Sequence, residues 1–201
     1  YKREHGAETG RLIGELTLHI DDEGATGEPD VLKELIDKMT AKYGELKIQE
    51  GQYHHIGHEY TQTWDQEGTT ITDGQEFYTE TIEPIPIPQG PRSRLLTEPE
   101  RSSLRHLNGE MGYGEQTRPD AMGRVAYSRQ NVDVNATVEH LLEANKALAV
   151  LQDPKATKVL TYAPQDSARL KLVGIADGAL RKKSEKHSQG CYYVLIMDVR
   201  D

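Results

Sequence analysis

Thr117-Arg118-Pro119-Asp120 is the stretch from which the fold of this 201-residue chain is best interpreted. Asp120 can begin a helix by accepting hydrogen bonds from backbone N–H groups. Arg118 can offer a planar fork of donors to a carboxylate or a carbonyl oxygen. The stretch therefore predicts a structural junction that leads into a helix.

The sequence around this junction predicts a helical middle region. Before it, Thr97-Glu98-Pro99-Glu100 has the pattern of a capping box with proline in the first turn. The helix that follows carries its apolar residues at Leu104, Leu107 and Met111. After the junction, Thr137 caps a third helix, which Pro154 ends. Apolar residues follow helical spacing along this third helix: Val138, Leu141, Leu142, Ala144, Leu148 and Leu151.

Strands are predicted on both sides of the helical region. Residues 10–22 alternate apolar and polar side chains, as a half-buried strand does. A helix then begins near Pro29 and ends at Gly44. Further strands are predicted at Lys47–Gln49, Gln52–Trp64, Thr69–Thr72, Lys158–Tyr162, Leu170–Ala176 and Cys191–Met197. Between the halves, Glu83-Pro84-Ile85-Pro86-Ile87-Pro88 predicts an extended, polyproline-like course and a domain boundary.

Composition limits the possible functions. The net charge is −9, which disfavours binding of nucleic acid, because proteins that bind nucleic acid neutralise its phosphates with lysine and arginine. A local basic patch at Arg181-Lys182-Lys183 and Lys186 is either a solvated turn or a small nucleic acid contact. The single cysteine, Cys191, favours an intracellular, reducing compartment. The sequence contains no run of about 18 apolar residues, so no membrane span is predicted.

A histidine cluster, His54-His55-Ile56-Gly57-His58, suggests a metal site. On one continuous strand, His54 and His58 would face the same side and share a metal with a third ligand from elsewhere. The alternative is a structural strand without metal.

Taken in order, three segments resemble the polyprotein of copia-type LTR retrotransposons. They are Leu18-His19-Ile20-Asp21-Asp22, the run from Gln116 to Asp120, and the run from Leu172 to Asp177. In that family a Tyr-Val-Asp-Asp polymerase box precedes a helical thumb and connection with a "TRPD" segment, and the first catalytic strand of RNase H follows.

The resemblance implies an α+β fold in three parts. Residues 1–88 would form a palm-like sheet, helix and hairpin, residues 89–155 a helical thumb and connection, and residues 156–201 the first strands of a truncated RNase H-like sheet.

The resemblance also implies the candidate site. Asp21 and Asp22 would correspond to polymerase carboxylates that hold two Mg²⁺ ions, and Asp177 to the first RNase H aspartate. The sequence departs from the family where His19 replaces an aromatic residue and where Ala179 and Leu180 replace a second aspartate and a tryptophan. The chain has 20 residues before Asp21 and no initiator methionine. We therefore expect a trimmed piece that lacks the remaining carboxylates, with these positions inactive.

Two functions follow as hypotheses, and whether the chain is an enzyme stays open. In the first, it is a reverse-transcriptase-derived pseudoenzyme without a cofactor that serves as a structural subunit. It would contact other protein subunits through open strand edges at Gln52–Trp64 and Cys191–Met197. In the second, it is a segment of an active RNA-directed DNA polymerase and RNase H that uses two Mg²⁺ ions.

Overall fold

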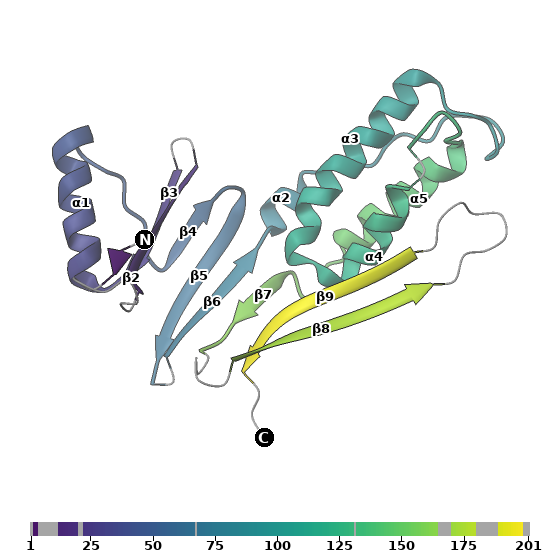
Figure 1. The fold of residues 1–201 in the computed structure, drawn as a ribbon. Coiled ribbons are helices and arrows are strands. Elements are labelled where there is room, and N and C mark those ends of the chain that lie inside the picture. Colours follow the sequence, from purple (N-terminus) through teal and green to yellow (C-terminus); the bar gives the residue numbers. More distant parts are fainter. Residues whose placement is uncertain are drawn as a thin grey trace. The chain divides into compact units, whose positions relative to one another are not determined.

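The computed structural model describes residues 2–3, 12–19, 22–66, 68–130, 132–164, 170–179 and 189–198. It divides the chain into two compact units: Tyr1–Thr63 with Ile71–Tyr162, and Trp64–Thr70 with Ala163–Asp201. Helices and antiparallel strands are mixed, so the predicted α+β class is confirmed (Figure 1). The three-part division drawn from the resemblance stays a prediction.

A three-stranded sheet and a helix come first along the chain. The sheet has the order β1-β2-β3, with β1 at Lys2–Arg3, β2 at Leu12–His19 and β3 at Asp22–Gly27. Helix α1 spans Pro29–Tyr43, and Gly44 follows it with φ 92°, as the proline and glycine predict.

A four-stranded sheet follows, in the order β4-β5-β6-β7. Its strands are β4 (Gln52–His55), β5 (His58–Asp65), β6 (Gly68–Gly74) and β7 (Val159–Tyr162). The single predicted strand Gln52–Trp64 is wrong, because Ile56 and Gly57 form a two-residue turn. Both have positive φ, 49° and 69°, which is the pattern of a type I′ hairpin turn.

The turn holds a β-branched residue in a conformation that favours glycine or asparagine. Ile56 is the one residue other than glycine with positive φ in the described part of the chain, and it is 38% exposed. A left-handed backbone costs a residue with a Cβ atom roughly 1–2 kcal/mol. The turn is therefore strained at Ile56.

We expect Ile56→Asn to raise the free energy of unfolding by about 1 kcal/mol, because asparagine tolerates this φ. Urea unfolding measures the change. The control is Ile48→Asn, at another exposed isoleucine without a positive φ. An equal response from both variants would show that polarity, and not backbone strain, causes the effect.

The helical region contains α2 (Glu76–Glu80), α3 (Glu98–Gly114), the 3₁₀ turn η1 (Glu115–Thr117), α4 (Pro119–Ser128) and α5 (Val138–Leu151). Both predicted helix starts are confirmed. The backbone N–H of Thr97 donates to the Glu100 carboxylate at 2.8 Å, and that of Thr137 donates to His140 Nδ1 at 2.8 Å.

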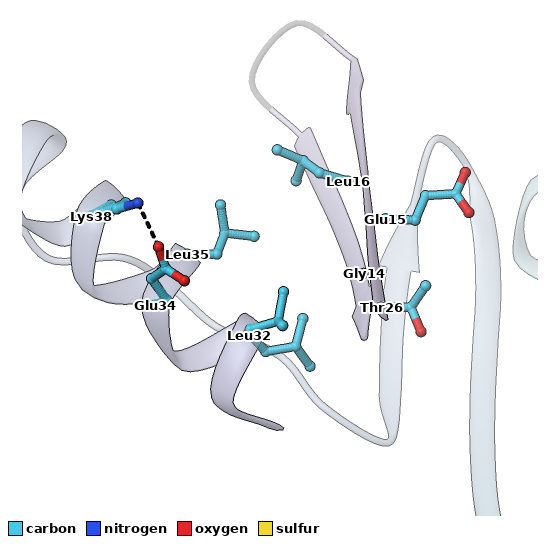
Figure 2. Close-up of a pocket in the computed structure, with 9 residues that line it drawn as sticks. Gly14, Glu15, Leu16, Thr26, Leu32, Glu34, Leu35 and Lys38 are labelled. Atoms are coloured by element: carbon cyan, nitrogen blue, oxygen red, sulfur yellow. Dashed lines mark hydrogen bonds and ion pairs between the residues drawn. The ribbon is translucent and has the colours of Figure 1, made fainter. Parts of the chain in front are cut away.

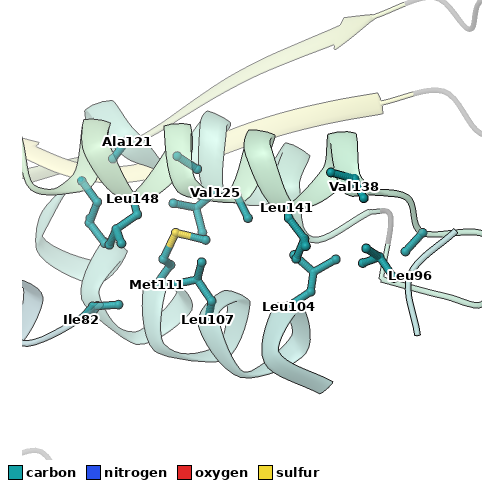
Figure 3. Close-up of a cluster of buried hydrophobic side chains, with 14 residues drawn as sticks. Ile82, Leu96, Leu104, Leu107, Met111, Ala121, Val125, Val138, Leu141 and Leu148 are labelled. Carbon is teal, nitrogen blue, oxygen red and sulfur yellow. The ribbon is translucent and has the colours of Figure 1, made fainter. Parts of the chain in front are cut away.

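The main hydrophobic core of the described residues lies between these helices. Leu104, Leu107 and Met111 of α3 point toward Val125 of α4 and Leu141 of α5 (Figure 3). All of the predicted apolar residues of α3 are buried there. The packing of α3, α4 and α5 therefore provides the apolar burial that holds this region together.

The second unit contains a two-stranded hairpin of β8 (Leu170–Ala179) and β9 (Gln189–Asp198). Its antiparallel register runs from Leu170 opposite Asp198 to Ala179 opposite Gln189. Leu172 is 73% exposed and Val194 is 59% exposed. A two-stranded hairpin alone is marginally stable in water, so this unit contributes little stability by itself.

Candidate functional site

The Thr117–Asp120 stretch forms a clamp centred on Arg118. The Arg118 side chain is 2% exposed, and its fork donates to both carboxylate oxygens of Asp120, at 2.8 and 2.7 Å. The same guanidinium donates to the carbonyl oxygens of Val150, at 2.9 Å, and of Leu151. These carbonyls end α5, where partial negative charge gathers and favours a cation. Arg118 therefore joins the start of α4 to the end of α5.

The charges of this clamp stabilise each other. Hydrogen bonds from Arg118 hold the pKa of Asp120 below its usual value, and the Asp120 carboxylate raises the pKa of Arg118. The predicted fork of Arg118 is confirmed. Asp120 is not the N-cap residue of α4 that the sequence predicts. Arg118 holds the N-cap position, and Asp120 lies in the first turn of the helix.

A second polar clamp holds the proline-rich segment. The side-chain amide of Asn145, on α5, accepts a hydrogen bond from the Ile85 N–H at 2.9 Å and donates to the Ile85 carbonyl at 2.8 Å. One residue past α5, the Gln152 amide donates to the Thr79 and Ile82 carbonyls, at 2.7 and 2.9 Å. The segment is neither helix nor strand, as its prolines predict, but these bonds fix it against α5.

A small pocket lies between α1 and the β2–β3 hairpin (Figure 2). Its volume is about 200 Å³, and Leu32 and Leu35 of α1 line it opposite Leu16 of β2. Gly14 allows the close approach, because a Cβ atom there would lie 2.8 Å from Val31 Cγ1. No residue of α1 is buried, so the apolar side chains of this helix are only partly covered.

The histidine cluster does not have the geometry expected for a shared metal. The turn at Ile56-Gly57 places His54 opposite Glu59 and His55 opposite His58, so the assumption of one continuous strand fails. Within the described ranges, no group of three or more His, Cys, Asp or Glu residues could hold a metal ion.

His58 instead belongs to a polar and aromatic cluster between the sheet and α3. Its Nδ1 lies 2.7 Å from Asp73 Oδ1, and both side chains are largely buried. The His58 ring stacks on Tyr60 and meets Tyr113 edge-on. Burial, with a smaller contribution from the Asp73 charge, raises the pKa of Tyr60 to about 12. The cluster joins β5 and β6 to α3.

The structure describes two of the three acidic candidate residues, Asp22 and Asp177. Asp21 lies outside the described residues. Asp22 begins β3, with its Cα opposite His19. Asp177 lies in β8 opposite Cys191, in the other unit of the chain. The basic patch at Arg181–Lys186 is outside the described residues. The proposed catalytic and metal-binding roles of Asp21, Asp22 and Asp177 stay predictions.

Comparison of the chain with protein-family models, with curated proteins and with solved structures finds no match. In the described ranges, no helix has the length and apolar character needed to cross a membrane.

Proposed function

We propose that this chain is a reverse-transcriptase-derived polypeptide of the copia type that serves as a protein-contacting part of a larger assembly. The sequence resemblance motivates the ancestry. The order of elements is what such a polypeptide would have: a hairpin of β2 and β3 with Asp22 at the start of β3, a helix, a second hairpin, a helical region that contains Arg118, and a hairpin that carries Asp177.

The single observation that carries the contact role is the pairing of the arginines in the helical region. Each arginine between residues 91 and 130 forms an ion pair within the chain: Arg92 with Glu139, Arg94 with Glu100, Arg101 and Arg105 with Glu98, Arg118 with Asp120, Arg124 with Glu143, and Arg129 with Glu115. A phosphate would have to displace a carboxylate that is already in contact. Together with the net charge of −9, these internal ion pairs favour contact with proteins over binding of nucleic acid.

The test measures binding of a fluorescein-labelled RNA–DNA primer–template by anisotropy between about 25 and 150 mM salt, over which the Debye length falls from about 20 to about 8 Å. We expect no saturable binding at the higher salt and only weak binding at the lower. Tight binding that weakens steeply with salt would reveal phosphate contacts and overturn the contact role.

A second candidate function is a part in active RNA-directed DNA synthesis. The observation in its favour is that Asp22 begins β3, with its Cα opposite His19 at the end of the neighbouring strand β2. Oxygen ligands of this kind suit Mg²⁺. Primer extension with Mg²⁺ distinguishes the two candidates: template-dependent extension that Asp21→Asn abolishes would establish the polymerase, and its absence from the wild-type chain agrees with the contact role.

A further inference from the structure

A groove of about 400 Å³ runs between the proline-rich segment and α3. One wall is formed by Glu83, Pro84, Ile85 and Pro86, and the other by Ser102, Ser103, His106, Leu107 and Glu110. Leu107 is buried, and Ile85 packs against the hydrophobic core. The groove therefore has an apolar floor with polar groups along its rim.

The charge of the groove has one sign. Glu83 and Glu110 contribute carboxylates, and among the residues that the structure describes no lysine or arginine lines the groove. His106 Nε2 lies 3.4 Å from Glu110 Oε1 at one edge. A ligand that fits this lining has an aliphatic stem for the floor and a cationic end for the carboxylates. Arginine and lysine side chains have this form.

The walls of the groove are set before any ligand arrives. Prolines at 84 and 86 fix the backbone φ angles of the segment, and Asn145 holds Ile85 between them through two hydrogen bonds. Tyr78 donates to the Glu110 carbonyl at 3.3 Å, which ties α2 to this turn of α3. A wall that is already ordered costs little conformational entropy on binding.

We propose that this groove binds an arginine or lysine side chain carried by a basic segment of a partner protein. The charge of the groove matches such a segment, and the net charge of −9 attracts it over a longer range. The same charge opposes nucleic acid and a second copy of this chain. The proposal rests on the protein-contacting role proposed above and names the surface and the chemistry of the partner.

The test uses fluorescein-labelled octaarginine as the probe, with the intact chain and anisotropy as the readout at fixed salt. The groove variant is Glu83→Gln with Glu110→Gln. Its matched control is Glu45→Gln with Glu50→Gln, which removes the same charge from two exposed residues elsewhere. We expect about five- to tenfold weaker binding for the groove variant and less than about twofold for the control, as expected for partly exposed charge pairs.

A third variant supplies the cation within the chain. His106→Arg places a guanidinium four residues before Glu110 on the same helix face, where it can pair with that carboxylate. It should weaken octaarginine binding about as much as Glu110→Gln does, whereas His106→Gln should not.

Three outcomes would overturn the proposal: wild-type chain that does not bind octaarginine, equal losses in the groove and control variants, or self-association in sedimentation that the groove variant abolishes. All of these leave the protein-contacting role standing. The protein-contacting role would instead be contradicted by salt-dependent binding of the primer–template, so failure of the groove proposal and failure of that role are distinguishable.

Discussion

Replacing Arg118 by alanine should lower the free energy of unfolding by about 3–4 kcal/mol, measured by urea unfolding. The variant loses hydrogen bonds to Asp120 and leaves the Val150 and Leu151 carbonyls without their donor. It also removes a large side chain that is nearly inaccessible to solvent. Each of these losses is destabilising, because the end of α5 packs on the core beside it.

Two variants separate the clamp from ordinary charge effects. Arg118→Lys keeps the charge but cannot form the planar fork, so we expect a loss of about 2 kcal/mol. Arg124→Ala removes an arginine whose pair with Glu143 is at 3.6 Å on the surface, and should cost less than about 1 kcal/mol. If lysine restored full stability, the charge alone would account for Arg118, and the fork geometry would be irrelevant.

Replacing Asn145 by alanine should cost about 2 kcal/mol, because the Ile85 N–H and carbonyl lose their side-chain partners together. Asn145→Asp should be no better, since a carboxylate can accept from the N–H but repels the carbonyl oxygen. Hydrogen exchange of the 83–88 segment gives a local readout, and both variants should speed exchange at Ile85.

Lys146→Ala is the matched control for this clamp. Lys146 is the next residue of α5 and pairs with Glu143 at the surface, so its loss should change stability by less than about 0.5 kcal/mol. Unchanged exchange at Ile85 in Asn145→Ala would mean that prolines alone hold the segment in place.

Local signals in the sequence predict the helices well. The capping box at Thr97 and the proline at 29 each mark a helix start that the structure confirms. The fork of Arg118 could also be anticipated, because a guanidinium beside a helix end has few other suitable partners. These features depend on residues close together in the chain.

Features that depend on distant residues were not predicted. Asn145 and Ile85 are 60 residues apart, and the one sequence signal is a polar residue within an apolar helical pattern. The pairing of His58 with Asp73 also requires knowledge of strand register. The turn at Ile56-Gly57 was not predicted for a different reason. Isoleucine favours strands and is disfavoured at positive φ, so Gly57 was the one residue there that indicated a turn.

We propose that this chain contacts protein and does not bind nucleic acid. The two partner classes are distinguished by titrating one preparation, in one buffer at physiological salt, with labelled octaarginine and with the labelled RNA–DNA primer–template. We expect saturable binding of the peptide and at least about tenfold weaker binding of the nucleic acid. Tighter binding of the primer–template than of the peptide would contradict the proposal.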